Sequence, residues 1–449
     1  SLFPELYRTM WDLFEQIEAP FTNTLWHCER NGIRIDQQYL STRQSPVEAE
    51  LASVEKEINQ LAGRMLNPNS PKQIQEYFFK TLQGVKPVTW TKGGKTGVKT
   101  PSTDSEFLEH YRHELPMAAL LLRHRELDKL LGTYILGLAD ACDPGSRIHP
   151  KFNQDVARTG RLSSNDPNCQ NIPNPDNDKF KIRGAFIPQQ GCELIVGDYE
   201  ALEMRLLAAA SQEEEMLNIF RRGWDIHMGN ASMMYGIPYD DIVKAKKTDK
   251  KVKEGELDAS AMTDYMYLCL QRRGDAKVVG FGLNYGMKAN KLSRNLGCSV
   301  EDAEKKIELY LATYPAVSKF YEEAITETRK TGYAFSIIGR RRYLPEIASG
   351  DDFSRWRAER QAVNHQIQGG AADVARLAMN NIFYSNFERR YGCRMLLQVH
   401  DELVFECPTE TAVEAQAEIK EWMEHPFPKD LDVPLTTSIG RGPSWMNAK

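Results

Sequence analysis

The stretch Leu396-Leu397-Gln398-Val399-His400-Asp401-Glu402-Leu403-Val404-Phe405 decides the fold of this chain. Apolar runs flank a short polar centre, and this pattern predicts two strands joined by a tight turn. The turn places two carboxylates beside an apolar sheet, where they carry a desolvation cost that a bound cation offsets. Taken alone, such a tripeptide is more often an ordinary hairpin turn. The prediction of a chemical role therefore depends on other segments.

A second strand-end carboxylate lies far upstream. Asp198 follows the apolar stretch Leu194-Ile195-Val196-Gly197 and opens the segment Asp198-Tyr199-Glu200-Ala201-Leu202-Glu203-Met204-Arg205. Two strand-end acids that meet in space can hold two Mg²⁺ ions about 3.5–4 Å apart, an arrangement used for in-line displacement at phosphorus. The two segments together predict a two-metal site at the end of one sheet.

A third segment carries Arg273, Lys277, Phe281 and Tyr285 at every fourth position. This spacing is helical, so the four side chains form a slowly winding stripe, with the cations in the first turn and the rings below. Helix N-termini favour anions, and Arg and Lys add charge-assisted contacts. The stripe predicts phosphates at its top and a base at its bottom. The alternative is a solvated basic helix end above a core aromatic pair.

Composition bounds the class of protein. A chain of 449 residues is expected to form two or three cores, and its 41% hydrophobic and 27% charged content is ordinary for a globular protein without a membrane anchor. Its eight cysteines include no CxxC pair, which argues against a zinc site and for a reducing compartment.

The net charge of −5 gives no global signal for nucleic-acid binding, so a DNA contact must come from local basic patches. Residues 86–99 carry four lysines, and residues 244–253 carry six lysines against Asp249. We expect both segments to be flexible loops, either contacting phosphates or merely solvated. The third patch is Arg340-Arg341-Arg342.

The three segments together resemble motifs A, B and C of the family A, polymerase I-like DNA polymerases, and the resemblance spans nearly the whole chain. Further similar segments are residues 69–73, 102–104, 125–127 with Lys129, 159–173, 339–345 and 358–369. The resemblance implies an α+β fold with right-hand polymerase architecture, in which the palm is an antiparallel sheet and the fingers and thumb are helical.

The same resemblance implies a domain organisation. Residues 1–45 form a lead-in that contributes to the base of the palm, residues 46–146 the thumb, residues 147–215 the first part of the palm with motif A, residues 216–345 the fingers with motif B, and residues 346–449 the second part of the palm with motif C. The Lys-rich segment of about 238–263 is longer than the connection expected in typical bacterial members, and we interpret it as an insertion. The glycine–lysine loop 91–100 of the thumb is expected to reach DNA phosphates.

The implied activity is template-directed DNA synthesis in replication or repair, in which a primer 3′-hydroxyl attacks the α-phosphate of a dNTP and pyrophosphate leaves. Asp198 and Asp401 would hold two Mg²⁺ ions, for which Mn²⁺ can substitute. The backbone carbonyl of Tyr199 would be a further metal ligand, and Glu402 an auxiliary acid. Lys277 would protonate the departing pyrophosphate.

Other residues match the substrate-binding positions of the family. The implied dNTP-binding residues are Arg273, Lys277, Phe281, Tyr285, His227 and Glu203. Glu203 would close off space at the sugar 2′ position and so favour DNA over RNA synthesis. The implied primer–template residues are Arg161, Asn168, Gln170, Asn171, Lys129, Arg360, Asn364, Gln368, Gln398 and His400. Minor-groove acceptors are similar for all correct pairs, so such probes check pair shape rather than sequence.

Two departures from the family pattern stand out. Glu200 and Ala201 replace the usual Ser-Gln of motif A, and the order Arg-Gly-Asp-Ala-Lys at 273–277 resembles phage replicative members more than bacterial ones. The constellation of a 3′–5′ exonuclease is not found in these 449 residues, and whether such a domain lies upstream is left open.

The expected partners are primer–template DNA and dNTPs, with replication partners unknown. We expect an intracellular monomer in the cytoplasm or nucleoid, or in the host cytoplasm if the protein is viral, and an organelle stays open. Two rival functions remain: a single-subunit RNA polymerase, and a catalytically silent protein that binds primer–template DNA.

Overall fold

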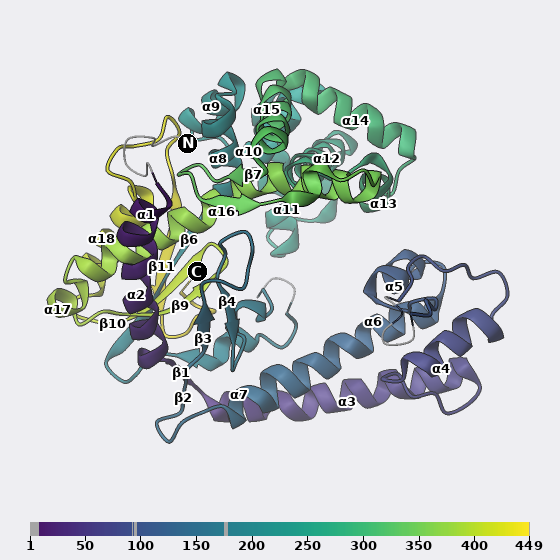
Figure 1. The fold of residues 1–449 in the computed structure, drawn as a ribbon. Helices are drawn as coiled ribbons and strands as arrows, with labels where there is room; N and C mark the ends of the chain where they lie inside the picture. The colour runs from purple at the N-terminus through teal and green to yellow at the C-terminus, as the bar shows by residue number, and fades with distance from the viewer. Residues whose placement is uncertain (1–8, 92, 94–96, 175–177, 449) are drawn as a thin grey trace.

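The computed structural model describes residues 9–91, 93, 97–174 and 178–448 (Figure 1). Lys92 and Lys95, which belong to the loop expected to reach DNA phosphates, lie outside the described residues. Among the described residues, none of the helices has the length and apolar content needed to cross a membrane.

A four-stranded antiparallel sheet forms the centre of one half of the molecule. Its strand order is β11 (Thr437–Gly442), β6 (Cys192–Tyr199), β10 (Glu402–Pro408) and β9 (Arg394–Val399). β9 and β10 form the predicted hairpin, with Glu402 opposite Val399, and β10 also pairs with β6, with Glu402 opposite Asp198. The upstream acid and the hairpin acids therefore meet at one end of one sheet.

β6 and β10 are apolar along most of their length, and helices cover the sheet that they form. α18 (Ala412–Glu424) packs on β6 and β11, and α2 (Ala19–Asn31) packs on β9. The long helix α16 (Asp352–Tyr384) contacts both of these helices and also reaches the helical layer above (Figure 1). The smaller elements of this half are α1 (Met10–Leu13), α17 (Phe387–Tyr391), the sheet of β2 (Arg147–Ile148), β1 (Ile33–Ile35) and β5 (Phe186–Ile187), and the pair β3 (Lys151–Asn153) and β4 (Ser163–Asn165).

A second helical layer has its own apolar core, which helices α8 to α15 build around α12. Its helices are α8 (Leu202–Ser211), α9 (Glu214–Arg221), α10 (Ile226–Tyr235), α11 (Tyr239–Lys253), α12 (Asp264–Asn284), α13 (Ala289–Leu296), α14 (Val300–Thr313) and α15 (Pro315–Thr331). The short strands β7 (Tyr333–Phe335) and β8 (Arg341–Tyr343) follow and lead back toward α16.

A third unit projects away from the sheet as a pair of long helices (Figure 1). α3 (Gln37–Ala62) packs along α6 (Pro116–Lys129), with α4 (Pro71–Glu76) and α5 (Ser105–Tyr111) at the far end and α7 (Gly137–Asp140) at the near end. The side chains of Asp36 and Ser70 cap α3 and α4, as expected for short polar residues that precede helices.

Several expectations about local structure are corrected. The Lys-rich segment 244–253 lies in helix α11 rather than in a flexible loop, because Ile242 and Ala245 of this helix are buried against neighbouring helices. The predicted domain boundaries at 45/46 and 215/216 lie within α3 and α9, and the domain division itself stays a prediction.

The motif B helix is also longer than expected. α12 begins at Asp264 with Thr263 as its cap, so Arg273 lies in the middle of the helix and not in its first turn. The helix N-terminus therefore cannot supply the expected attraction for phosphates at Arg273.

Candidate active site

The hairpin turn brings Asp401 next to the end of β6. The backbone N–H of Tyr199 donates to the carbonyl oxygen of Asp401 at 3.1 Å, so residues 198–199 and 401 are directly joined. His400 adopts the left-handed conformation (φ +57°), which lets the chain reverse within two residues. The predicted meeting of the two acidic segments is thus present in the structure.

Burial and like charges make the ionised form of Asp401 unfavourable. Desolvation, together with the carboxylates of Glu203 and Asp198, raises the pKa of Asp401 to about 6, although Arg161 opposes this shift. Carboxylates that crowd together in a partly dry site bind a divalent cation well, because the cation removes both penalties.

The donor set fits Mg²⁺ chemistry. In the described part of the chain, no group of three or more His, Cys, Asp and Glu side chains forms a complete metal cage. Mg²⁺ rarely uses such cages in enzymes of phosphate chemistry, since one or two carboxylates suffice when water and substrate phosphates supply the remaining oxygens. Asp198, Asp401 and the nearby carbonyl of Tyr199 are oxygen donors of this kind.

Glu402 lies opposite Asp198 on β6, so the two side chains share one face of the sheet. Its carboxylate is buried and accepts hydrogen bonds from Arg183 at 3.3 Å and from the indole N–H of Trp445. The Arg183 guanidinium also stacks 4.1 Å from the Trp445 ring centroid. These contacts give Glu402 a role in holding the strand end, and they favour the predicted auxiliary role over direct catalysis.

Glu203, at the start of α8, joins two other predicted site residues. One carboxylate oxygen accepts from Arg161 and the other accepts from the hydroxyl of Tyr285 at 2.9 Å. Burial and the adjacent charge of Glu203 raise the pKa of Tyr285 to about 12, so its hydroxyl stays a donor. The structure therefore places residues from motif A, motif B and the loop 159–173 in one cluster.

The predicted stripe lies on α12 and faces α10. Arg273 donates to Asp225 at 3.3 Å, and the ring of His227 lies 5.1 Å from that of Phe281. Asp225 caps α10 by accepting from the backbone N–H groups of His227 and Met228. Burial lowers the pKa of His227 to about 4, aided by the charges of Lys277 and Arg273, so this imidazole is neutral near pH 7.

Predicted primer–template residues form a second cluster under the hairpin turn. Gln170 donates to the side chain of Gln398 at 2.8 Å, and Gln398 donates to the carbonyl of His400. Together with Arg161 and Asp401, Gln398 and His400 line a small cavity that also contacts α16.

Other predicted contacts with DNA have partners within the protein. The side chain of Asn168 accepts from the backbone N–H of Gln170 and so shapes the loop. Asn171 is exposed and lines a separate pocket with Lys129, between α6 and residues 171–174 and 178–180. Lys129 therefore belongs to a different surface from the acids.

Arg360, Asn364 and Gln368 lie on successive turns of α16. A Cβ at Gly286 would lie 2.1 Å from Arg360 Cγ, so the end of α12 rests directly on Arg360. Asn364 donates to Gln368 at 3.1 Å, and the Oδ1 atom of Asn364 is buried without a hydrogen-bond partner. Arg360 therefore contacts the end of the motif B helix, and Asn364 and Gln368 continue the same polar row along α16.

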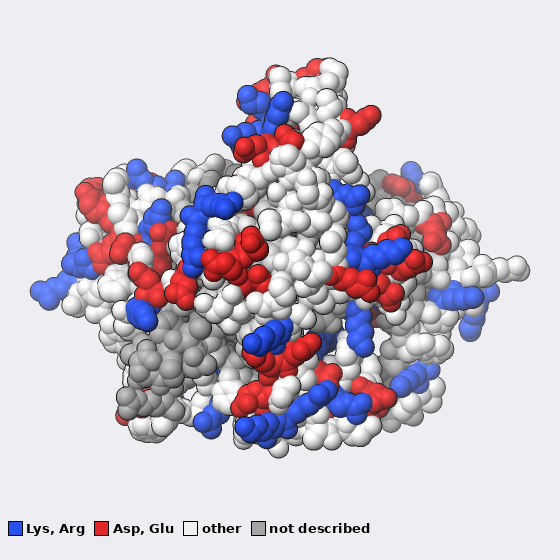
Figure 2. All heavy atoms as spheres, turned by 90° about the horizontal axis from the view of Figure 1, so that it is seen from above, with Lys and Arg blue, Asp and Glu red and all other residues white. Residues whose placement is uncertain are grey.

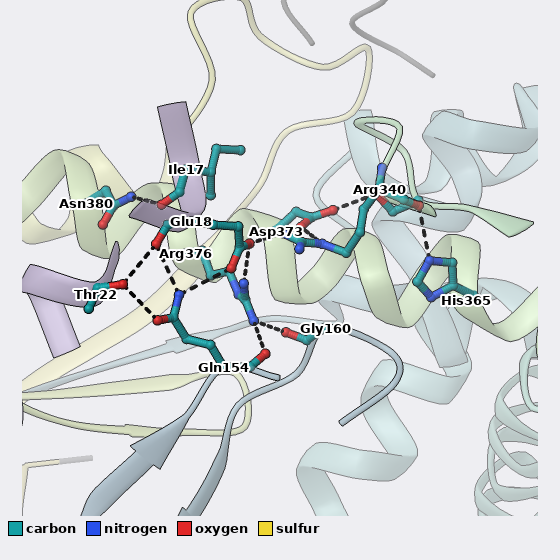
Figure 3. Close-up of polar contacts among 11 residues, drawn as sticks. Ile17, Glu18, Thr22, Gln154, Gly160, Arg340, His365, Asp373, Arg376 and Asn380 are labelled. Atoms are coloured by element: carbon teal, nitrogen blue, oxygen red, sulfur yellow. Dashed lines mark hydrogen bonds and ion pairs between the residues drawn. The ribbon is translucent and has the colours of Figure 1, made fainter. Parts of the chain in front are cut away.

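A buried ionic network supports the loop that carries Arg161 (Figure 3). Glu18 accepts from both Arg340 and Arg376, and Arg340 also donates to Asp373 at 2.7 Å. Arg376 in turn donates to the carbonyl of Gly160 at 2.6 Å, one residue before Arg161. Arg340, expected in a basic surface patch, is instead only 12% exposed, because these two carboxylates pair with it.

The outer face of the molecule in Figure 2 shows lysines and arginines interspersed with acids rather than a continuous basic surface. This distribution agrees with the net charge of −5. This face therefore offers no continuous basic surface to a nucleic acid.

Some residues of the site were missed by the sequence reasoning. Asp225 carries a usable signal, since Asp before an apolar helical run is a typical N-cap. Arg183, Trp445 and Arg376 carry none, because their partners lie far away in the sequence.

Comparison with known proteins gives matches over nearly the whole chain. The sequence model of DNA polymerase family A matches residues 37–254 and 260–447. The thermostable DNA polymerase I of Thermus filiformis is 39% identical over 450 residues, which cover 100% of this chain and 50% of that protein. DNA polymerase I of Bacillus subtilis strain 168 is 35% identical over 440 residues, covering 98% of this chain and 46% of that protein. The chain spans about half the length of these relatives.

A solved structure shares the fold. It is described as the POL domain of Pol1 from M. smegmatis in complex with DNA primer-template and dNTP, and it is similar with a TM-score of 0.84 and 33% identity. The match covers 98% of this chain and 73% of that chain.

Proposed function

Because the chain belongs to DNA polymerase family A, we propose that it adds dNTPs to a primer 3′-hydroxyl under the direction of a DNA template. The family match confirms the predicted resemblance, and the shared structure confirms the α+β right-hand architecture. The Mycobacterium relative was solved with primer-template and dNTP, which supports the same partners here.

The observation that carries the proposal is the meeting of Asp198 and Asp401 at one sheet end, joined through the Tyr199–Asp401 backbone bond. The cations of α12 supply the complementary charge for a polyphosphate. Acids for metal ions and cations for phosphates are the two halves of a nucleotidyl-transfer site.

In the proposed reaction the primer 3′-oxygen bonds to the α-phosphorus, the bridging bond to the β-phosphate breaks, and pyrophosphate leaves. Two Mg²⁺ ions held by Asp198, Asp401 and the Tyr199 carbonyl would lower the pKa of the hydroxyl and neutralise charge on the phosphates. Asp401 must be ionised to take part, and its pKa of about 6 leaves it so at neutral pH.

The α12 side chains would bind and orient the triphosphate. Lys277 makes no ion pair with the described residues, so its ammonium is free to contact phosphate and to donate a proton to the leaving pyrophosphate. Arg273 would add charge-assisted contacts, and neutral His227 a hydrogen bond. Phe281 and Tyr285 would pack against the nascent base pair.

Glu203 and the polar cluster would test the substrate. Glu203 is held in place by Arg161 and Tyr285, so its side chain would fill the space that a 2′-hydroxyl needs. Gln170, Gln398, His400, Asn364 and Gln368 would contact the primer–template minor groove.

The decisive experiment is extension of a labelled primer on a DNA template with Mg²⁺ and either dNTPs or rNTPs, comparing the protein with its Asp401→Asn variant. We expect growth with dNTPs that the variant loses by at least about a thousandfold. Growth that is equal in the variant would contradict the assignment of Asp401.

The same assay separates the rival functions. Efficient growth with rNTPs would favour an RNA polymerase. Binding of primer–template DNA with steep salt dependence, but without extension, would favour a silent binding protein. The protein is further proposed to act as a monomer inside the cell, in the cytoplasm or nucleoid.

A further inference from the structure

Helix α11 is attached to the phosphate-binding end of the site by its first residue. The ring of Tyr239 stacks on Trp224 at 3.9 Å, with an angle of 8° between the ring planes. The Tyr239 hydroxyl accepts the backbone N–H of Asp225 at 2.9 Å. At the other side, Tyr265 at the start of α12 donates to Asp241 of α11 at 2.9 Å. The Lys-rich helix is therefore held in a defined position beside Asp225 and His227.

One lysine of α11 reaches into the cation cluster. Lys246 Nζ lies 3.6 Å from Asp225 Oδ2, and the Arg273 guanidinium lies 3.3 Å from the same oxygen. Both cations therefore lie on one carboxylate oxygen, close enough for a single polyphosphate chain to contact both. The side chain of Lys246 is 49% exposed, so a ligand can approach it.

The cluster has more positive charge than its protein partners neutralise. Lys246 and Arg273 both pair with the carboxylate of Asp225, and the charges of Lys246, Arg273 and Lys277 all act on His227. His227 is 8% exposed, and its Nδ1 atom is buried without a hydrogen-bond partner, as is the Nε atom of Arg273. Unpartnered donors and surplus cations in one place indicate an anionic ligand.

We propose that Lys246 is an additional polyphosphate-binding residue, which contacts the terminal phosphates of the dNTP and the pyrophosphate product, and that Asp225 holds Lys246 and Arg273 in place until phosphate displaces it. The inference rests on the proposed function and extends its nucleotide site to α11. Because Asp225 Oδ1 is used to cap α10, only its Oδ2 atom is exchanged for a phosphate oxygen.

The other lysines of α11 supply a matched control. Lys250 forms an exposed pair with Glu254 of the same helix, and Lys253 pairs with Asp249. Lys250 lies about one turn beyond Lys246 and carries the same charge, but its ion-pair partner Glu254 is not part of the site. Lys250→Met should therefore leave nucleotide binding unchanged.

The test measures equilibrium binding of dNTP, and separately of pyrophosphate, to the complex with a dideoxy-terminated primer–template, by calorimetry in the presence of Mg²⁺. We expect Lys246→Met to weaken both affinities by about threefold to tenfold, the size of a partly exposed charged contact. The loss should shrink at high salt. Asp225→Asn keeps a capping side chain but removes the competing charge, so it should tighten pyrophosphate binding.

Primer extension by the unmodified protein is run in parallel and tests the proposed function on its own. Unchanged dNTP and pyrophosphate affinities in Lys246→Met would overturn the inference, even if the unmodified protein extends primers. A variant that loses affinity for primer–template DNA but not for dNTP would also overturn it, since Lys246 would then be a DNA contact. Weaker nucleotide binding with unchanged DNA affinity, and with Lys250→Met at the unmodified level, would support it.

Discussion

At the scale of single residues, Asp401 shows how burial and neighbouring carboxylates change the ionisation of a site residue. Its pKa of about 6 lies above the ordinary value of 3.8, because burial and the carboxylates of Glu203 and Asp198 disfavour the ionised form. Between about pH 4 and pH 6, Asp401 is therefore protonated in the folded protein but ionised in the unfolded chain. Ionised Asp401 consequently lowers the stability of the metal-free fold above this range.

We predict that Asp401→Asn stabilises the metal-free protein while it abolishes primer extension. The unmodified protein loses the stability contributed by protonated Asp401 as pH rises through about 6. The variant does not lose stability in this way, because asparagine does not titrate. The gain should thus be close to zero at pH 4 and reach up to about 3 kcal/mol at pH 8. Denaturant unfolding in EDTA at both pH values measures it. A variant that is less stable than the unmodified protein at pH 8 would contradict this account.

Glu203 gives a second prediction at this scale. Glu203→Ala removes the side chain expected to fill the 2′ space and also the acceptor for Arg161 and Tyr285. Incorporation of rNTPs relative to dNTPs should rise about tenfold to a hundredfold, as when a pocket gains room for one small group. Steady-state kcat/KM ratios measure this change. Glu203→Gln keeps the volume, so it is the control and should retain discrimination; a ratio unchanged in Glu203→Ala would refute the steric role.

At the scale of elements, the network around Glu18 links three segments that are distant in sequence: the π-helical stretch Phe14–Glu18, the turn before β8, and helix α16. Arg376 is buried, and its guanidinium satisfies the carbonyls of Gly160 and Gln154 as well as Glu18 (Figure 3). A buried charge with several partners is costly to remove, because each partner is left unpaired.

Arg376→Met should lower the free energy of unfolding by about 3–5 kcal/mol and weaken primer–template binding, since the loop that carries Arg161 loses its anchor. Urea unfolding and fluorescence anisotropy at a temperature where the variant is folded measure the two effects. Arg355→Met is the control on the same helix: its exposed pair with Asp352 should contribute less than about 1 kcal/mol. Loss of stability with unchanged DNA affinity would show that the network does not position the loop.

At the scale of the whole molecule, the tips of two units touch across the space between them. Arg294 of α13 lies 3.3 Å from Glu106 of α5, and both side chains are about half exposed. An exposed pair of this kind contributes little to stability. The pair joins the second helical layer, which contains α13, to the projecting unit, which contains α5. We therefore expect it to affect mainly the distance between these two units.

We predict that Arg294→Glu changes the free energy of unfolding by less than about 1 kcal/mol but widens the DNA-free molecule through like-charge repulsion. Small-angle scattering at low salt should show a larger radius of gyration, which the double charge swap Arg294→Glu with Glu106→Arg restores. Saturating primer–template DNA should remove the difference. An unchanged radius in the single variant at low salt would refute the bridging role.

The sequence alone determined the parts of this protein that depend on local patterns. The apolar runs on both sides of Asp401 predict the β9–β10 hairpin, and the four-residue spacing from Arg273 to Tyr285 predicts a helix with cations and rings on one side. The spacing of side chains along a helix and the residues of a turn are properties of neighbouring positions, so they can be recognised in a single sequence. The family resemblance then implied that the acidic segments meet.

Tertiary structure alone decided which charges are buried and with which partners. Arg340 and Lys246 look alike in sequence, as members of basic runs, yet Arg340 is largely covered between Glu18 and Asp373 while Lys246 reaches Asp225 at the surface. The physical reason is that burial of a charge depends on whether a distant carboxylate lies within a few ångströms, and sequence spacing does not encode that distance. The same reason explains why Trp445, as a partner of Glu402, gave no signal before the fold was known.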